Sequence, residues 1–217
     1  MKPPDDLGFV HVFVPAAAPG PDSATLLLLH GTGGDERDLL SLGRELSPDA
    51  TLLGVRGKVL ENGMPRFFRR LAEGVFDVED LKCRTDELAR FIDAAVEYYG
   101  LSKRRLVAVG YSNGANIAAS LMLSHPHHLR TGVLFRAMLP FMPEIVRDFS
   151  ELSVFLAIGM QDPIIPRERA EQLAAVLQSG GADVSMFQHR GGHELGQDDI
   201  AAAQSWLLDK MKKGIAA

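Results

Sequence analysis

The strongest constraint on the fold is a set of short segments that are apolar at nearly every residue. Thr25–His30 reads TLLLLH, and Arg105–Gly110 reads RLVAVG. Strands that are buried on both faces have this composition, because neither side of the sheet meets water. These segments therefore predict a mostly parallel sheet of about seven strands with helices on both faces. The expected strands are Phe9–Val14, Thr25–His30, Thr51–Arg56, Arg105–Gly110, Gly132–Arg136, Val154–Gly159 and Val184–His189.

Longer amphipathic segments separate these strands. In Glu79–Tyr99, apolar side chains recur at steps of three and four residues, and Gly100 follows where a helix C-cap would stand. Three further helices are predicted, at Asn113–Ser124, Arg167–Gln178 and Asp198–Lys213. Alternation of strands and helices predicts an α/β fold. Because these elements use nearly the whole chain, we expect a single domain over residues 1–217 and no lid domain.

Composition narrows the class of partner. The net charge is -5, which provides no general attraction to nucleic acid or to an anionic membrane. The longest apolar runs, such as Leu26–Leu29, are far shorter than a membrane span, so stable membrane insertion is not expected. Cys83 is the one cysteine, and no long apolar stretch begins the chain. We therefore expect a cytoplasmic protein.

The segment Gly110–Gly114 has the pattern G-x-S-x-G between a predicted strand and a predicted helix. Such a turn holds the serine in a strained conformation at the carboxyl end of the sheet, with its Oγ exposed. Ser112 is therefore the candidate nucleophile. The N–H of Asn113, at the start of the helix, is a candidate donor to an oxyanion. The alternative is an ordinary strand-turn-helix in which the serine only caps the helix.

A serine nucleophile needs a base and an acid that orients the base. The strand at Val154–Gly159 is followed by Asp162, and the strand at Val184–His189 is followed by His193. Both loops leave the same edge of the sheet as Ser112, in the order that this architecture requires. Asp162 could instead only initiate a turn. His189 competes with His193, but it stands at the end of its strand rather than in the loop.

The loop HGTGG, at residues 30–34, comes directly after the apolar run Leu26–Leu29. In this architecture the loop at that position supplies the second oxyanion donor. The N–H of Thr32 is the candidate. A phosphate-binding loop is the rival reading, but neither G-K-[ST] nor G-x-G-x-x-G is present. A histidine cluster after the predicted helix at Asn113–Ser124 is interpreted as a solvated helix end, so no metal site is expected. Its members are His125, His127 and His128.

The segments HGTGGDE, GYSNGAN, GMQDPIIP and GGHEL occur in that order over nearly the full length. Together they resemble the phospholipase/carboxylesterase family of small α/β-hydrolases, and most closely its bacterial carboxylesterase branch. VRGKVLENGMPRFFRR (Val55–Arg70) is also similar to that branch. The resemblance implies an α/β-hydrolase fold, esterase or thioesterase activity, no cofactor and frequently a homodimer.

The same resemblance implies residue roles. Ser112 would be the nucleophile, His193 the base and Asp162 its partner, with Thr32 and Asn113 as oxyanion donors. The related acyl-protein thioesterases usually carry Gln at the position of Asn113. The related dienelactone hydrolases use a cysteine nucleophile, whereas position 112 here is Ser.

Apolar residues follow two predicted strands at the same edge of the sheet. We expect them either to bind a substrate with hydrophobic character or to pack beneath their own loops or in a dimer contact. They are Met64, Phe67, Phe68, Met138, Leu139 and Phe141. Three arginines lie among them, at positions 66, 69 and 70. These could meet an anionic substrate, but pairing with Glu73, Asp77 and Glu79 is the favoured interpretation.

The sequence therefore predicts a serine carboxylic-ester hydrolase that acts through an acyl-enzyme on a small to medium ester. An acyl thioesterase or lysophospholipase with the same three residues is one alternative. A non-catalytic binding protein on a hydrolase fold is another, of a different class. No nucleic-acid partner is expected.

Overall fold

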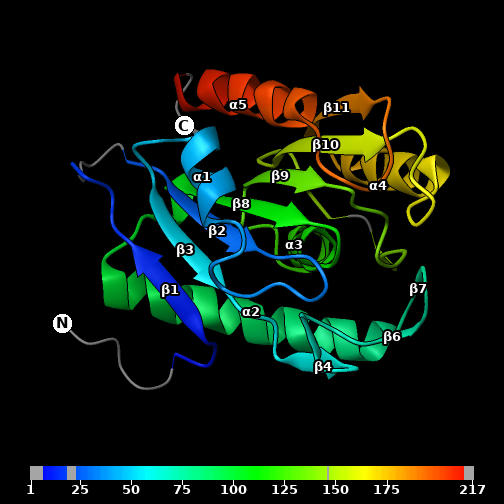
Figure 1. Cartoon of the computed structure of the whole chain (residues 1–217), viewed down its shortest axis with the longest axis horizontal. Coiled ribbons are helices and arrows are strands. Elements are labelled where there is room, and N and C mark those ends of the chain that lie inside the picture. The colour runs from blue at the N-terminus through cyan, green and yellow to red at the C-terminus, as the bar shows by residue number, and fades with distance from the viewer. Residues whose placement is uncertain (1–6, 19–22, 146, 213–217) are drawn as a thin grey trace.

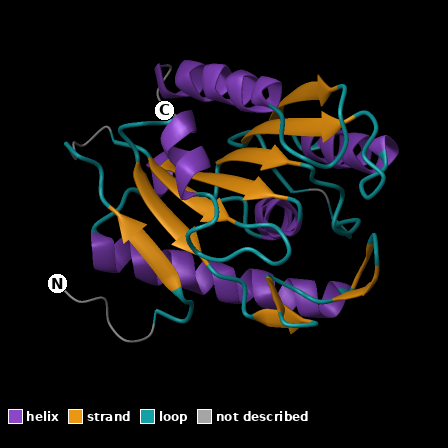
Figure 2. Ribbon diagram, viewed as in Figure 1, coloured by secondary structure: helices purple, strands orange, loops and turns teal. Residues whose placement is uncertain are grey.

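A central sheet of seven strands organises the molecule (Figures 1 and 2). The computed structural model describes residues 7–18, 23–145 and 147–212. The strand order is β1-β3-β2-β8-β9-β10-β11, with β1 antiparallel to β3 and the other pairs parallel. These strands are β1 (His11–Val14), β2 (Thr25–Leu29), β3 (Thr51–Val55), β8 (Leu106–Tyr111), β9 (Thr131–Phe135), β10 (Ser153–Gly159) and β11 (Asp183–His189). The α/β class and all seven predicted strands are confirmed.

The continuous apolar runs belong to strands with two buried faces. Every residue of β2 is buried. Leu27 and Leu29 join the core that α2, α3 and α4 cover, and Leu26 and Leu28 join the core that α1 and α5 cover. Because successive side chains point to opposite faces of a strand, a strand between two helical layers must be apolar at every position.

The described residues contain five α-helices, which form these two layers (Figure 2). They are α1 (Leu40–Leu46), α2 (Val78–Tyr99), α3 (Asn113–Ser124), α4 (Arg167–Ser179) and α5 (Gln197–Lys212); a short 3-10 helix, η1, spans Lys103–Arg105. The four predicted helices are confirmed, although residue 213 lies outside the described residues. Helix α1 was not predicted, because its seven residues are too few for a clear periodicity. None of the helices in the described part of the chain has the length and apolarity needed to cross a bilayer.

Helix α2 shows how local sequence sets the ends of an element. Asp77 caps its N-terminus, where the side chain accepts a hydrogen bond from the N–H of Asp80. Gly100 ends the helix in the left-handed region, at φ +65°. A residue without a Cβ adopts that conformation at little cost, which is why the predicted C-cap is correct.

Two small hairpins lie between β3 and α2. They are formed by β4 (Val59–Glu61) with β5 (Met64–Arg66), and by β6 (Arg70–Ala72) with β7 (Val75–Phe76). The sequence predicts a loop at Glu61–Arg70, within this segment. Its strands have two or three residues each, so no periodic pattern could reveal them.

The order of the strands reverses at β2. From β2 the chain moves to β3 on one side, and it later enters β8 on the other side. In open α/β sheets a crevice forms outside the carboxyl ends of the strands at such a switch point. The loops after β2 and β8, with the HGTGG and G-x-S-x-G segments, meet there.

Candidate active site

Ser112 stands between β8 and α3 in a strained conformation, with φ +51° and ψ −112°. Its N–H donates to the carbonyl of Phe135 on the neighbouring strand β9, at 2.9 Å. A Cβ on Gly114 would lie 2.0 Å from the carbonyl oxygen of Leu29, and a Cβ on Gly110 would lie 2.6 Å from the Cα of Ala115. Both glycines of the motif are therefore required for helix α3 to approach the sheet this closely.

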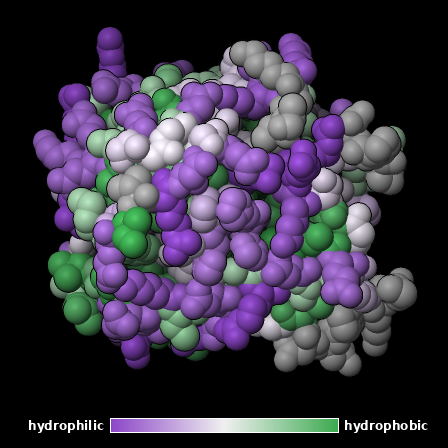
Figure 3. All heavy atoms as spheres, turned by 180° about the vertical axis from the view of Figure 1, so that it is seen from behind, coloured by the Kyte–Doolittle hydropathy of each residue, from purple (hydrophilic) through white to green (hydrophobic). Residues whose placement is uncertain are grey.

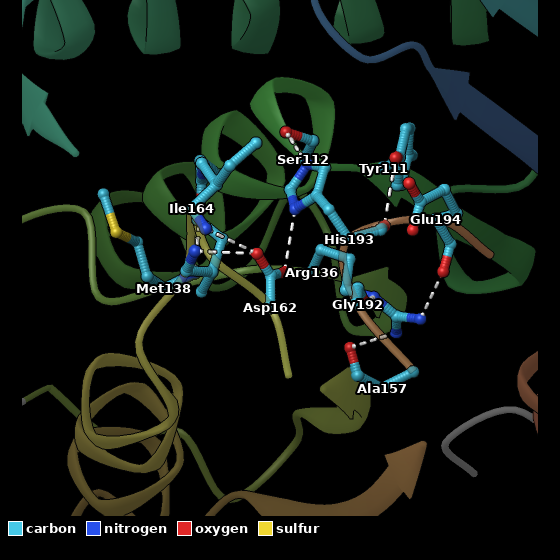
Figure 4. Close-up of polar contacts among 12 residues, drawn as sticks. Tyr111, Ser112, Arg136, Met138, Ala157, Asp162, Ile164, Gly192, His193 and Glu194 are labelled. Carbon is cyan, nitrogen blue, oxygen red and sulfur yellow. Dashed lines mark hydrogen bonds and ion pairs between the residues drawn. The ribbon is translucent and has the colours of Figure 1, made fainter. Parts of the chain in front are cut away.

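Figure 4 shows the imidazole of His193 between Ser112 and Asp162. His193 Nε2 lies 3.0 Å from Ser112 Oγ, and Nδ1 lies 2.8 Å from Asp162 Oδ2. A carboxylate accepts hydrogen bonds, so we assign the proton to Nδ1, which leaves Nε2 to accept from the serine hydroxyl. The side chain of Asp162 is 1% exposed, and its other oxygen accepts from the N–H groups of Ile164 and Ile165.

The loop that carries His193 is held through three consecutive backbone carbonyls (Figure 4). Arg136 Nε donates to the carbonyl of Gly192 at 3.0 Å, and Arg136 Nη2 donates to that of Glu194 at 2.7 Å. The hydroxyl of Tyr111 donates to the carbonyl of His193 at 3.1 Å. Burial raises the pKa of Tyr111, which keeps this hydroxyl protonated as a donor. The position of the imidazole therefore depends on two residues outside the three that the sequence predicts.

Arg136 is itself fixed by Asp199 on α5. The two side chains are fully buried, and Arg136 Nη1 and Nη2 donate to the two carboxylate oxygens at 3.0 and 2.8 Å. Arg136 also has a positive φ of 56°, which is unusual for a residue with a long side chain. Arg136 and Tyr111 were not predicted from the sequence as residues of the site. An arginine that directly follows the apolar strand TGVLF was the one available signal.

Two amide groups border the site without a partner in the described part of the chain. Asn113 is the first residue of α3, where backbone N–H groups have no partner inside the helix. The N–H of Thr32 forms no hydrogen bond with another described residue. Both residues line the same cavity as Ser112 and His193. Thr32 and Asn113 therefore stay the candidate donors to an oxygen atom near the serine.

The hairpin β4–β5 supports the loop that carries Thr32. The N–H of Gly33 donates to the carbonyl of Pro65 at 2.9 Å, and Arg66 Nη1 donates to Thr32 Oγ1 at 2.5 Å. His30 is buried, and burial lowers the pKa of its imidazole. The loop is thus held by contacts to a segment that precedes α2, not by its own glycines alone.

A cavity of about 310 Å³ opens beside Ser112. This volume is at the lower end of the range for small-molecule sites. Apolar and charged groups share its wall, which contains Thr32, Arg66, Arg70, Glu73, Gly74, Phe76, Tyr111, Ser112, Asn113, Asn116, Met138, Ile164, Ile165 and His193.

Of the six apolar residues expected at the substrate, Met138 lines this cavity. Phe67, Phe68 and Leu139 do not, because their side chains are buried in the hydrophobic core. The N–H of Phe67 donates to Asn113 Oδ1, which turns this segment inward and explains the correction.

Phe141 and Met64 also lie outside the set of residues that line this cavity. Phe141 lines a second cavity, beside α2 and the end of α3. Met64 is exposed, with its side chain near Gly33. Met64, Phe67, Phe68, Leu139 and Phe141 therefore do not line the cavity beside Ser112, and Phe67, Phe68 and Leu139 follow the packing alternative instead.

The three arginines pair with carboxylates as favoured, and Asp77 is the one predicted partner that takes part. Arg69 pairs with Asp77 at 3.0 Å and lies 3.7 Å from Asp80. The other two both pair with Glu61, and neither of the predicted partners Glu73 and Glu79 takes part.

The histidine cluster pairs with carboxylates on α2. His125 lies 2.7 Å from Asp86, and His128 lies 3.3 Å from Asp93. Within residues 7–18, 23–145 and 147–212, no group of three or more His, Cys, Asp or Glu side chains is arranged to hold a metal ion.

Comparison with known proteins agrees with this fold. The model of the phospholipase/carboxylesterase family matches residues 60–210. A Bacillus subtilis (strain 168) protein named as a hydrolase, MhqD, is 51% identical over 190 residues, which cover 88% of this chain and 95% of the relative. The crystal structure of a Bacillus cereus carboxylesterase is 45% identical, covers 94% of this chain and 95% of its own, and superposes with a TM-score of 0.90.

A carboxylesterase structure from Mesorhizobium loti is 31% identical. It covers 94% of this chain and 96% of its own, with a TM-score of 0.88. Sequence identity above 30% over nearly the whole length, together with the family match, shows common family membership and not only a similar fold. The chain is therefore a member of the phospholipase/carboxylesterase family of α/β-hydrolases.

Proposed function

We propose that this chain is a serine carboxylic-ester hydrolase that acts through an acyl-enzyme intermediate. One observation carries the proposal: consecutive hydrogen bonds join Ser112, His193 and Asp162, and Ser112 and His193 line a cavity that Thr32 and Asn113 also line. Membership of a hydrolase family supports the reaction class.

In the acylation step, Ser112 Oγ attacks the carbonyl carbon of the ester while His193 Nε2 accepts its proton. Asp162 keeps the imidazole in the required tautomer and stabilises the imidazolium. The N–H groups of Thr32 and Asn113 bind the oxygen of the tetrahedral intermediate. His193 then gives the proton to the leaving alcohol, and Ser112 retains the acyl group.

In the deacylation step, His193 accepts a proton from water, which attacks the acyl-enzyme. The second tetrahedral intermediate collapses, the carboxylic acid leaves, and Ser112 regains its proton. Each oxyanion donor is expected to contribute on the order of 10²–10³ to the rate.

The test is hydrolysis of p-nitrophenyl esters from acetate to palmitate by the wild type and by Ser112→Ala. We expect the substitution to lower kcat/KM by about 10⁴-fold or more. The cavity of about 310 Å³ and its charged wall groups favour short acyl chains over palmitate.

Ser124→Ala is the matched control, because Ser124 lies at the other end of α3 and outside the cavity. It should retain wild-type rates. Equal rates for wild type and Ser112→Ala, together with no labelling of Ser112 by a fluorophosphonate, would exclude the proposal in favour of a binding protein. Faster turnover of acyl thioesters than of the matched oxygen esters would favour a thioesterase.

A further inference from the structure

The wall of the cavity beside Ser112 contains two arginines that the proposed mechanism does not use. Arg66 and Arg70 both line it. Arg69 lies between Phe68 and Arg70 in sequence, yet it is absent from the cavity wall and its side chain is 62% exposed. The placement of the two guanidinium groups at the cavity is therefore specific to these positions and not a property of the whole basic segment.

Arg66 is a fixed part of the wall. Its side chain is 4% exposed. Arg66 Nε donates to the carbonyl of Phe68 at 3.2 Å and lies 3.1 Å from Glu61 Oε2, and Nη1 donates to Thr32 Oγ1. A guanidinium held by three partners loses little freedom when it binds a ligand, so its remaining donors are pre-organised.

The ion pairs at this part of the wall contain two arginines but one glutamate. Glu61 is the carboxylate shared by both arginines, since Arg70 Nε lies 2.9 and 3.1 Å from its two oxygens. Burial lowers the pKa of Arg66, and the neighbouring charge of Arg70 lowers it further, while Glu61 raises it. Glu73 also lines the cavity, but it is exposed and forms no ion pair with either arginine. Arg66 and Arg70 therefore share one carboxylate. Arg69, in contrast, pairs with Asp77 and lies near Asp80, which also pairs with Arg84.

From this arrangement we propose that the cavity selects esters that carry a carboxylate near the scissile bond, which Arg66 and Arg70 bind. The inference rests on the proposed ester hydrolase function and names its substrate class. Two guanidinium groups share the carboxylate of Glu61, so a substrate carboxylate can complete a second ion pair, and a guanidinium fork matches the geometry of that group. The sequence predicts a substrate of hydrophobic character, and the proposal adds to it a carboxylate near the scissile bond.

The carboxylate can belong to the acyl part or to the alcohol part of the ester, and two substrate pairs distinguish these cases. Monomethyl succinate and methyl 4-methylpentanoate have the same shape on the acyl side. Acetoxyacetate and isobutyl acetate have the same shape on the alcohol side. In each pair only the first member is anionic. The measured quantity is the ratio of kcat/KM for the anionic and the neutral member.

For the wild type we expect a ratio of at least about ten in one of the two pairs, which is the size of effect that a charge-assisted hydrogen bond gives. Arg70→Gln leaves Arg66 and Glu61 as one cation and one anion, so the ratio should fall by about tenfold. Glu61→Gln removes the shared anion, so the ratio should rise. Arg69→Gln is the matched control, and its ratio should equal that of the wild type.

Ratios near one in both pairs for the wild type would overturn the proposal, and so would equal effects of Arg70→Gln and Arg69→Gln. Because each ratio compares two substrates of one protein sample, a variant that is partly unfolded does not alter it. The proposed function is tested separately, by Ser112-dependent hydrolysis of p-nitrophenyl acetate. If that hydrolysis persists while the ratios stay near one, only the substrate class is wrong.

Discussion

At the scale of single residues, two unfavourable backbone conformations coincide with the candidate site. Ser112 and Arg136 both have positive φ angles, of 51° and 56°. Each such residue costs on the order of 1–3 kcal/mol, and it persists only where neighbouring contacts fix it. For Ser112 these contacts come from β9 and from the glycines of its turn. For Arg136 they come from Asp199 and the carbonyls of the His193 loop.

The contacts of Arg136 lead to a prediction about a positioning residue. Arg136→Met removes the donors to two of the three carbonyls that hold the His193 loop, so the imidazole should lose its alignment with Ser112. We expect kcat for p-nitrophenyl acetate to fall by about 10²-fold with a smaller change in KM, since a misplacement of about 1 Å is enough for such a loss. Arg136→Lys keeps the charge beside Asp199 and should recover part of the rate.

Steady-state kinetics from pH 5 to 9 and thermal unfolding of both variants provide the check. A folded Arg136→Met protein with the kcat and pH profile of the wild type would show that Arg136 does not position His193. A loss of activity that only follows the unfolded fraction, without any recovery in Arg136→Lys, would assign Arg136 a structural role alone.

At the scale of elements, the segment between β3 and α2 supports the loop after β2. His30 Nδ1 lies 2.6 Å from the carbonyl of Gly31, and the N–H of Gly57 donates to His30 Nε2 at 3.0 Å. The first ring nitrogen must therefore carry the proton and the second must be free of one. A proton on Nε2 would face the N–H of Gly57 and would break this contact.

This arrangement predicts a pH dependence of stability. Burial lowers the pKa of His30 below the ordinary value of 6.5, so on acidification the unfolded chain binds this proton before the folded chain does. The contribution of His30 is complete above pH 6.5 and is lost as the pH falls below that value. The free energy of unfolding should therefore decrease on acidification below pH 6.5.

Urea unfolding from pH 5 to 7.5 measures this slope. In His30→Gln the side-chain amide can still accept from Gly57 and donate to Gly31, but it does not titrate, so the slope should be smaller. An unchanged slope in His30→Gln would mean that other groups cause the acid sensitivity.

At the scale of the whole molecule, two helical layers cover the sheet. Figure 3 shows one face of the molecule, which is largely hydrophilic and where hydrophobic side chains form separate patches. Exposed apolar side chains occur around the segments that follow β5 and β9, with Leu71 73% exposed, Met142 68% and Ile145 78%. Such groups mark surfaces for association when they cluster. The homodimer expected from the family resemblance stays a prediction.

Sedimentation velocity tests this prediction. We expect a species of twice the chain mass of 23.6 kDa, and we expect Ile145→Glu to convert it to single chains because a buried charge opposes association. Leu208→Glu on α5 is the control, since Leu208 is also exposed but lies on the other helical layer. A wild-type protein with the mass of one chain at every concentration would contradict the prediction.

The sequence by itself determined the class of fold and the candidate residues at the ends of strands. Apolar runs such as TLLLL are visible locally because a strand between two helical layers needs apolar side chains in both directions. Ser112, Asp162 and His193 follow β8, β10 and β11, and parallel topology brings those ends to one edge of the sheet. The expectation that these three lie together therefore follows from the order of elements, without any knowledge of side-chain contacts.

Only the tertiary structure decided which side chains face the cavity. Phe67 and Arg66 are neighbours in a three-residue strand and the turn after it, yet the phenyl ring enters the core and the guanidinium lines the cavity. Similarly, Arg136 follows an apolar strand, but its role depends on carbonyls more than fifty residues away in sequence. Short irregular segments have no periodic pattern, so their orientation is set by long-range packing and hydrogen bonds. Those contacts exist only once the sheet and both helical layers have assembled.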